Sequence, residues 1–593
     1  MTESNYWQGP MNRRLRRRGM LRGTALGGAA LAFAAACGGS SNSGGNTNSG
    51  SSNSSQPGNP TAAGRAGGTP AAGAAPATAA AAAAAGAQPK YGGSLVSPLQ
   101  KEPTNYDPHL QADSSKVGFH DMTLNGLVRL KTVGITDSQS LVVEPDLLAS
   151  MPESPDKTTL LLKLRPGVKW QNLAPVNGRA FDAQDIKYNI DRMKLDTQAD
   201  GGANEHSYIQ QPVDSVTVID PQTVQVKFKT PSPLWINFMA TGYQKVIARE
   251  VTTPTTVMVG TGPFIMTQHD RDAQATFKKN PVYFKQGLPY LDEFIWRADG
   301  TIAHQVAGLK TGDYGFGAAN PQDFQDLKKA NPKIVEQKYL GLGYPCGGFD
   351  LTVQKLQDKR VRQAISLAVD WDGVIKALYD GDGYRVPPIP AGFAQYTAKP
   401  KDTPQYYEYN VAKAKQLMQA AGYDANKPLQ IEIETDTAYP ENIKMQPIMQ
   451  EALKQIFVNV TALPTLPPTD FLGKRNSPGT GWTVRLWNHA AFGEPDEFLS
   501  AFYHTTGSRN YGKWGGPELD ALIEKQRGDV TTDERAKVLM DIQKYLADQM
   551  YRFGLVSPTP RQALQPWLKG MVTLAAETGY QGLQVENSWI DKS

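Results

Sequence analysis

The chain has very little cysteine and little imbalance of charge. Only two of its 593 residues are cysteines, Cys37 and Cys346, which excludes a disulfide framework and a metal site built from several cysteines. The formal net charge of +4 is small for this length, so the composition gives no reason to expect binding to nucleic acid. Cys346 has no histidine or basic residue near it in the sequence to activate it, and we interpret it as a buried structural thiol.

The chain also lacks a hydrophobic run long enough to stay in a membrane. The apolar stretch from Thr24 to Ala36 is shorter than the roughly 17–25 apolar residues that span a bilayer. It follows a basic segment, so residues 1–36 are predicted to be a signal peptide. The segment from Arg17 to Arg22 resembles a twin-arginine export signal, and an ordinary basic segment for the general secretion route is the alternative.

The position of Cys37, directly after the apolar stretch, predicts lipidation. Three small residues precede it, as they precede the modified cysteine of bacterial lipoproteins, and plain cleavage after an A-x-A sequence is the alternative. Residues 37–90 are rich in Gly, Ser, Asn, Ala and Pro and have no apolar periodicity, which favours a disordered tether. We therefore expect an exported protein that is lipid-anchored to the outer face of the cytoplasmic membrane, in the periplasm or cell envelope.

The remaining residues predict a mixed α/β body of more than one lobe, because about 500 residues exceed what one core supports. The stretch "TTLLLKLRPGVKW" is typical of two strands around a turn, and "VTVIDPQTVQVKFKTP" is typical of a hairpin. The stretch "FDAQDIKYNIDRMK" predicts a helix that Asp182 caps. Asp358, Asp370 and Asn410 are predicted to cap three more helices.

No catalytic motif accompanies this pattern. The sequence has no nucleophile elbow, no zinc-binding H-E-x-x-H and no phosphate-binding loop. Its seven histidines are scattered, so we expect no metal site and no cofactor. We therefore expect a protein that is not an enzyme, and a secreted hydrolase is the alternative of another class.

Several stretches, in the same order, resemble the family 5 extracytoplasmic solute-binding proteins of ABC importers. These are "EPDLLASMPESPDKTTLLLKLRPGVKW", "GRAFDAQDIKYNIDR", "VGTGPFIM", "NPVYFKQGLPYLDEF", "DKRVRQAISLAVDWDGVIKALYDGDGY", "NVAKAKQLMQAAGY" and "ERAKVLMDIQKYLADQMYRFGLV". The family includes dipeptide-, oligopeptide- and nickel-binding proteins. The resemblance implies a two-lobed periplasmic-binding-protein-like fold of type II, with an extra subdomain in lobe one and a hinge between the lobes.

The resemblance also implies domain boundaries. Lobe one is expected to comprise residues 91–339 and a C-terminal return at 559–593, and lobe two residues 340–558. The chain would then cross between the lobes near 340–343 and again near 557–560. Both places contain Gly or Pro, and hinge segments that absorb backbone rotation often do.

In the peptide-binding members, a loop of lobe two carries an aspartate that pairs with the α-ammonium of the peptide. The corresponding stretch is "RLWNHAAFGEPDEFL", and Ala491 stands at the position of that aspartate. A buried ammonium without a partner costs several kcal/mol, so Ala491 argues against recognition of a free peptide N-terminus in the usual way. A shifted loop would let Glu494 or Asp496 replace the aspartate, and helix capping is the alternative role for both.

Aromatic and backbone groups are further ligand candidates. Trp487, Phe492 and Tyr511 offer flat apolar surface, and we place Trp487 on the cleft wall but Trp482 in the core. The segment from Glu102 to Asn105 matches a family segment that lines the cleft through backbone groups, and a simple strand-to-turn connection is its alternative. The predicted ligand-binding residues are Glu102, Thr104, Asn105, Trp487, His489, Ala491, Phe492, Glu494, Asp496 and Tyr511.

These observations predict a monomeric substrate-binding lipoprotein that closes on its ligand like a Venus flytrap. It would capture peptides or a related small organic solute between its lobes and deliver it to the transmembrane subunits of an ABC permease. The alternative within the same fold is a non-peptide ligand: an oligosaccharide, an opine-like compound or a metal chelate. A sensor subunit would share the same fold.

Overall fold

The computed structural model describes residues 88–99, 102–110, 114–132, 141–198, 204, 206–467, 470–471, 482–489, 493–507, 509–528, 532–573 and 585–593. All of them belong to one compact unit, Ala75–Ser593. The predicted signal peptide, Cys37 and the tether as far as residue 87 lie outside the described residues. Within the described ranges, we find no helix with the length and apolar character needed to cross a bilayer.

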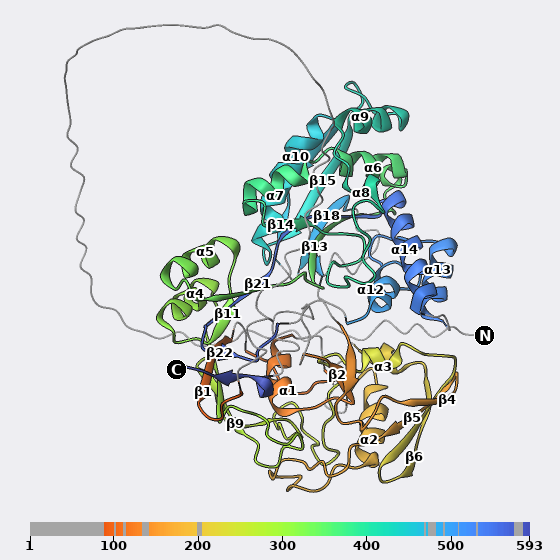
Figure 1. The fold of residues 1–593 in the computed structure, drawn as a ribbon. Helices are drawn as coiled ribbons and strands as arrows, with labels where there is room; N and C mark the ends of the chain where they lie inside the picture. Colours follow the sequence, from red (N-terminus) through yellow and green to blue (C-terminus); the bar gives the residue numbers. More distant parts are fainter. Residues whose placement is uncertain are drawn as a thin grey trace, which may run out of the picture. The chain divides into compact units, whose positions relative to one another are not determined.

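One part of the molecule, here called lobe one, contains a four-stranded sheet in the order β1-β10-β9-β8 (Figure 1). Its strands are β1 (Ser94–Leu99), β10 (Glu293–Ala298), β9 (Gln274–Lys279) and β8 (Phe264–Asp270). β1 is parallel to β10, and the other neighbours are antiparallel. The helix α1 (Val117–Thr123) contributes Phe119 and Met122 to the core beneath this sheet.

A second sheet of lobe one is completed by the C-terminal part of the chain. Its strands are β11 (Phe316–Ala318), β21 (Arg561–Leu564) and β12 (Val335–Lys338). β21 lies between the other two strands and is antiparallel to both. The helices α4 (Ile302–Thr311) and α5 (Pro321–Ala330) lie beside this sheet in Figure 1.

A third sheet of lobe one has the order β4-β5-β7-β6. Its strands are β4 (Glu153–Asp156), β5 (Thr159–Lys163), β7 (Thr223–Phe228) and β6 (Val213–Asp220), with α2 (Ala183–Met193) packed on them and the pair β2 (Val128–Leu130) and β3 (Val143–Pro145) nearby. The predicted hairpin is confirmed as β6 and β7, and Asp182 caps α2 in a capping box with Asp185. The strand expected after the Arg165-Pro166-Gly167 turn is only a single bridge, between Lys169 and Ala180.

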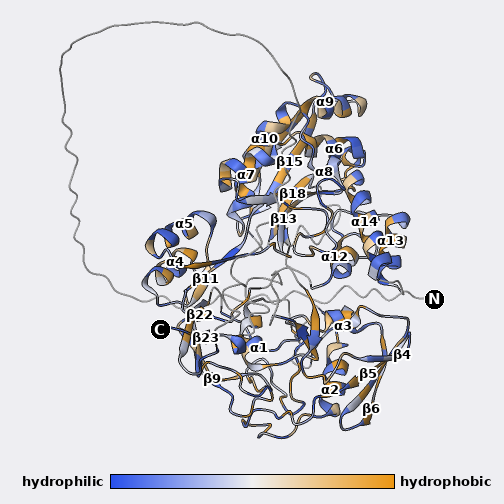
Figure 2. Ribbon diagram, in the orientation of Figure 1, coloured by the Kyte–Doolittle hydropathy of each residue, from blue (hydrophilic) through white to orange (hydrophobic). Residues whose placement is uncertain are grey.

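The other part, lobe two, is built around a six-stranded sheet in the order β16-β15-β18-β13-β19, with β17 beside β15. The strands are β16 (Val458–Ala462), β15 (Leu429–Asp436), β18 (Val484–His489), β13 (Tyr344–Phe349), β19 (Arg552–Gly554) and β17 (Thr465–Leu466). The helices are α6 (Lys359–Leu367), α7 (Trp371–Tyr379), α8 (Pro404–Tyr407), α9 (Val411–Ala420), α10 (Pro440–Lys454), α12 (Pro495–Phe502), α13 (Pro517–Arg527) and α14 (Thr532–Gln549). Figure 2 shows hydrophobic and hydrophilic residues alternating along these helices, as expected where one face is buried.

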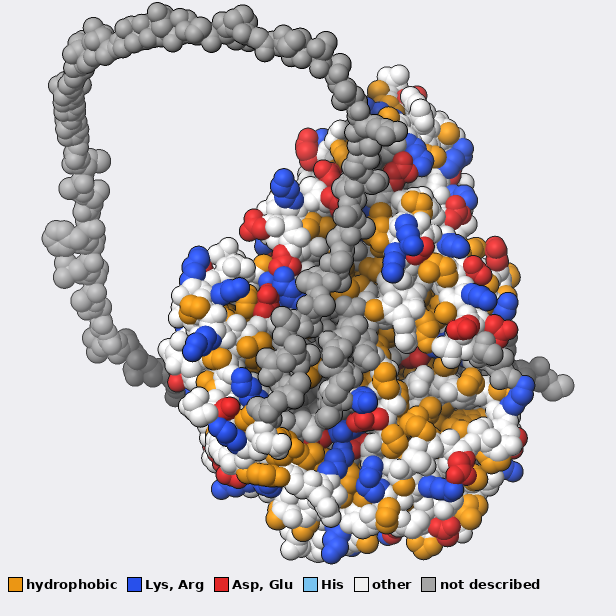
Figure 3. Space-filling view, in the orientation of Figure 1, with side chains coloured by type: hydrophobic (Ala, Val, Ile, Leu, Met, Phe, Trp, Pro, Cys, Tyr) orange, Lys and Arg blue, Asp and Glu red, His pale blue; other side chains and the backbone are white. Residues whose placement is uncertain are grey.

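Local sequence signals account for the helix starts in lobe two. Asp358, Asp370 and Asn410 are the N-caps of α6, α7 and α9, and each side chain accepts a hydrogen bond from a backbone N–H of the first turn. These three predictions are confirmed. Figure 3 shows lysine and arginine mixed with aspartate and glutamate over the face drawn, in agreement with the small net charge.

Cys346 lies in β13 and is 1% exposed, as predicted for a structural thiol. The sequence shows no basic residue near it, but the fold supplies one. The fold brings Arg552 of β19 beside it, and a guanidinium Nη2 donates a hydrogen bond to Sγ over 2.9 Å. The rings of Trp487 and Trp514 have their centroids 5.2 and 5.4 Å from this guanidinium.

Candidate functional site

The first turn of α12 is one place where lobe two contacts lobe one. Glu494 is the N-cap of this helix, is 4% exposed, and accepts a hydrogen bond from the Asp496 backbone N–H. Its carboxylate is paired with the guanidinium of Arg535 on α14. Asn237 of the short helix α3 (Trp235–Phe238) in lobe one approaches Glu494 Oε2 to 3.5 Å. The capping interpretation of Glu494 is therefore confirmed.

Asp496 is also buried and fully engaged. It accepts hydrogen bonds from Arg527 Nε at 3.2 Å and from Ser500 Oγ at 2.9 Å, and a third from the amide of Gln526. Arg527 and Gln526 come from α13, so Asp496 ties the start of α12 to the next helix. These three hydrogen-bond partners of the Asp496 carboxylate all belong to lobe two.

Glu497 makes a direct contact with lobe one. It is 4% exposed, and the hydroxyl of Tyr208, in the 3-10 helix Ser207–Gln210, donates to its carboxylate. Burial raises the pKa of Glu497 to about 7, against the smaller lowering effects of this hydrogen bond and of Arg509. The sequence offered Glu497 only as a residue in the first turn of a helix, and nothing local indicated the pairing with Tyr208.

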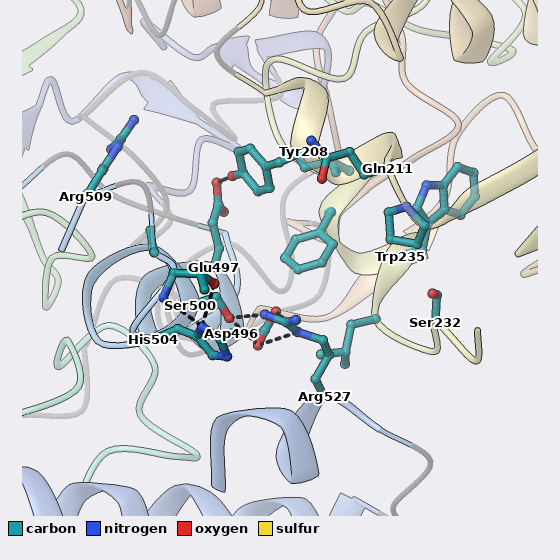
Figure 4. A pocket seen from close by; sticks show the side chains of 17 residues that line it. Tyr208, Gln211, Ser232, Trp235, Asp496, Glu497, Ser500, His504, Arg509 and Arg527 are labelled. Carbon is teal, nitrogen blue, oxygen red and sulfur yellow. Dashed lines mark hydrogen bonds and ion pairs between the residues drawn. The ribbon is translucent and has the colours of Figure 1, made fainter. Parts of the chain in front are cut away.

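A cavity of about 500 Å³ lies next to this contact (Figure 4). Two segments far apart in the sequence line it, residues 208–238 of lobe one and residues 496–527 of lobe two. Ile209, Leu234 and Trp235 are among the apolar lining residues from lobe one. In Figure 4 Tyr208 and Glu497 point toward each other, and Arg527 points toward Asp496. The volume falls within the range of roughly 300–1,000 Å³ that is usual for ligand pockets.

The predicted lobe-one residues do not line this cavity. The carboxylate of Glu102 is 2.8 Å from Nε2 of His269, and Nδ1 of the same ring contacts the Tyr106 hydroxyl. Asn105 Oδ1 accepts the backbone N–H of Asp107 over 3.1 Å, and Thr104 is exposed. The side chains of Glu102 and Asn105 thus bond to other groups of lobe one.

Among the predicted lobe-two residues, Trp487 has a different position from the expected one. It is 2% exposed and stacks on Trp514, with ring centroids 6.0 Å apart, so it lies in the core and not on a cleft wall. The physical reason is that Gly348 on β13 leaves room for its ring under the sheet. Trp482 is 5% exposed, which confirms its core position. Tyr511 is half-buried beside Phe502, with ring centroids 6.5 Å apart.

Other predicted residues fall outside what can be described. His489 ends β18, but its side chain is not described, and Ala491 and Phe492 lie outside the described residues. No group of three or more histidine, cysteine, aspartate or glutamate side chains in the described ranges is arranged to hold a metal ion. Among the predicted residues whose side chains the structure describes, Asp496 lines the cavity.

Comparison with known proteins identifies the family. The family model for bacterial extracellular solute-binding proteins, family 5 Middle, matches residues 142–510. The chain belongs to this family. Among curated relatives, the dipeptide-binding protein of Escherichia coli K12 is 25% identical over 509 residues, covering 81% of this chain and 92% of the relative. Heme-binding protein A of Haemophilus influenzae is 24% identical over 519 residues, covering 82% and 91%.

Solved structures of similar proteins support the two-lobed α/β fold. HbpA2 from Haemophilus parasuis superposes with a TM-score of 0.71 at 22% identity, covering 84% of this chain and all of its own. The oligopeptide-binding protein AppA from Bacillus subtilis, in complex with a nonapeptide, gives a TM-score of 0.67 at 21% identity, covering 85% and 100%. The predicted fold class is thereby confirmed.

The burial of Glu497 in this family 5 protein has a pH-dependent consequence. The pKa of this carboxyl group is about 7 in the folded protein and about 4.3 in the unfolded chain. Between about pH 4.5 and 7 only the unfolded chain releases the proton, so the free energy of unfolding of the protein falls as the pH rises through this range. The variant Glu497→Gln keeps an acceptor for Tyr208 and cannot ionise. We expect it to be more stable than the parent by about 1–3 kcal/mol at pH 7.5, and equal to it near pH 4.5.

Urea unfolding at the two pH values measures this difference. The control is Glu451→Gln, because the Glu451 side chain is 76% exposed and its substitution is expected to change little at either pH. If Glu497→Gln is more stable than the parent by the same amount at both pH values, the pH dependence does not come from Glu497.

Proposed function

We propose that the protein is an extracytoplasmic substrate-binding protein that captures peptides or a related small organic solute and delivers it to an ABC permease. The observation that carries this proposal is the cavity of about 500 Å³ between residues 208–238 and 496–527, in a chain of family 5. Both lobes contribute walls, so a ligand there stabilises the closed arrangement through contacts that an open form lacks. Binding of this kind makes and breaks no covalent bond, and we propose no enzymatic activity.

We further propose a division into lobe one (91–339 and 559–593) and lobe two (340–558). The pairing of β21 with β11 and β12 supports the C-terminal return to lobe one. The two crossing segments lie side by side, because the Tyr339 backbone N–H donates to the Pro560 carbonyl over 3.1 Å. Asp382 of lobe two accepts hydrogen bonds from Lys338 and Arg561, at 2.9 and 2.5 Å, and braces this hinge.

For the N-terminal region we propose export and lipid anchoring. Residues 1–36 would be removed as a signal peptide, and Cys37 would carry the lipid that holds a monomer at the outer face of the cytoplasmic membrane. Metabolic labelling with a lipid precursor tests this: Cys37→Ser is expected to abolish the label and to release the protein from the membrane fraction.

Thermal unfolding in the presence of ligands tests the function. The panel contains dipeptides to hexapeptides with free and acetylated N-termini, oligosaccharides, opine-like conjugates and nickel chelates. A compound that binds only the native state stabilises it by about 2.7 kcal/mol at a hundredfold excess over Kd. We expect at least one organic class to raise the unfolding temperature in a concentration-dependent way. No shift with any class contradicts the proposed function.

A further inference from the structure

The contact between Glu497 and Tyr208 joins the two lobes at the cavity (Figure 4). Glu497 belongs to α12 of lobe two, and its hydrogen-bond donor, the Tyr208 hydroxyl, belongs to lobe one. The other carboxylate oxygen of Glu497, Oε2, is buried and has no hydrogen-bond partner in the described part of the chain. An ionised carboxylate is therefore poorly compensated at this place while the lobes are together.

Separation of the lobes changes the surroundings of this carboxylate. Tyr208 moves away with lobe one, and water then reaches Glu497, which is only 4% exposed while the lobes are in contact. Burial raises the pKa of Glu497 to about 7 in this closed arrangement, against the lowering effects of Tyr208, Arg509 and the Gly493 backbone. A glutamate in water titrates near pH 4.3. Between these two pH values, closing the lobes therefore takes up a proton.

The charged groups of lobe two around Glu497 keep their own partners when the lobes separate. These groups form the ion pairs Glu494–Arg535, Asp496–Arg527 and Glu524–His504, and both members of each pair belong to lobe two. Burial raises the pKa of Glu494 as well, but Arg535 stays beside it in either arrangement. Arg509 stays charged throughout, because an arginine titrates above pH 12.

On the side of lobe one, His206 is the titratable group beside Tyr208, with ring centroids 6.3 Å apart. Burial lowers the pKa of His206 to about 3, and Arg509, Lys116 and His109 add to this effect. If opening exposes His206, it gains a proton only below about pH 6.5, and this favours the open form in acid. Its effect is opposite in sign to that of Glu497, so the range from pH 6.5 to 8 isolates Glu497.

We propose that Glu497 and Tyr208 form a latch that holds the two lobes together when Glu497 is protonated and releases them when it ionises. The proposal rests on the proposed capture of a solute between the lobes and adds a control of closure to it. The latch stabilises the closed arrangement fully below about pH 4.3, and this stabilisation is lost as the pH rises through about 7. The equilibrium constant for closing is expected to be about fourfold larger at pH 6.5 than at pH 8.

Single-molecule energy transfer between dyes on the two lobes measures this equilibrium without a ligand. The dyes are attached at two exposed positions, Thr217→Cys in β6 and Lys525→Cys in α13. The Cys37→Ser chain is used, in which the remaining Cys346 is only 1% exposed and is not labelled. Counting closed and open molecules at pH 8, 7.5, 7 and 6.5 gives the equilibrium constant for closing.

Three variants assign the pH dependence of closing. Glu497→Gln is expected to remove it, whereas Glu451→Gln, which changes an exposed glutamate, is expected to keep the fourfold rise. Tyr208→Phe removes the hydrogen bond that lowers the pKa of Glu497, so it is expected to move the midpoint of the pH profile upward. A contact with a purely structural role would weaken closing equally at every pH. Urea unfolding checks that each variant folds.

A closing equilibrium that does not change with pH, or that changes equally in the parent and in Glu497→Gln, overturns the proposal. Thermal unfolding with the ligand panel is a separate measurement, so the two failures can be told apart. If a compound of the panel binds but closing does not respond to Glu497, the latch is wrong and the transport function stands. If closing responds to Glu497 but no compound binds, the latch stands and the transport function fails.

Discussion

Replacing Arg535 with alanine is expected to lower the free energy of unfolding by about 3–5 kcal/mol, which is the usual cost of breaking a buried ion pair from one side. The Arg535 and Glu494 side chains are only 7% and 5% exposed. Burial is the largest single effect and lowers the pKa of Arg535, but the charge and hydrogen bond of Glu494, with smaller contributions from Tyr396 and Asp496, together raise it. The alanine variant leaves Glu494 buried without a counter-charge at the N-terminus of α12. Urea unfolding measures the loss.

Two controls identify the cause of this effect. The double variant Glu494→Gln with Arg535→Met leaves no unpaired charge, so it is expected to recover much of the lost stability. Lys454→Ala removes a pair whose side chains are 60% and 76% exposed, and it is expected to change little. If the single Arg535 variant is as stable as the parent, the pair does not anchor the contact face of lobe two.

Mild acid is expected to destabilise lobe one strongly, because three of its histidines are buried in the neutral form. Burial lowers the pKa of His109 to about 4 and the pKa values of His120 and His206 to about 3, and the neighbouring cations Arg192, Lys116 and Arg509 add to the effect. The unfolded chain binds these protons near pH 6.5. Stability is therefore complete above pH 6.5 and falls as pH drops toward 4.

The expected loss is about 2 kcal/mol for each histidine at pH 5, and about 6 kcal/mol for the three together as an upper bound. Urea unfolding at pH 7.5, 6 and 5 gives the slope of the unfolding free energy against pH. His120→Gln and His206→Gln are each expected to reduce it, whereas His304→Gln, whose side chain is 74% exposed, is expected to leave it unchanged. If neither histidine variant changes the dependence of the unfolding free energy on pH, other groups cause the loss of stability in acid.

The predictions that succeeded depend on residues close together in the sequence. Asp182, Asp358, Asp370 and Asn410 cap helices through bonds to backbone groups two or three residues away, so the sequence contains the whole interaction. The order of the quoted stretches likewise predicted family 5 and its two-lobed fold, and the family match confirms that membership.

The predictions that failed or were absent depend on distant contacts. The sequence predicts Trp487 on a cleft wall, but the residue is buried against Gly348 and Trp514, which lie on other segments. Glu497 bonds to Tyr208, which is 289 residues away in the sequence. Cys346 bonds to Arg552, which is 206 residues away. Neither partner is marked by any local pattern, because a tyrosine or arginine at either position is compatible with many surroundings.

The position of β21 between β11 and β12 determines when this sheet of lobe one can form. Arg561 of this strand bonds Glu336 of β12, 225 residues earlier, and the residues between them form lobe two. During synthesis β11 and β12 emerge long before the strand that joins them, so both present unpaired edges while lobe two is being made. The sheet β11-β21-β12 therefore cannot form until β21 has been synthesised, and its formation joins segments more than 200 residues apart, a kind of contact that slows folding.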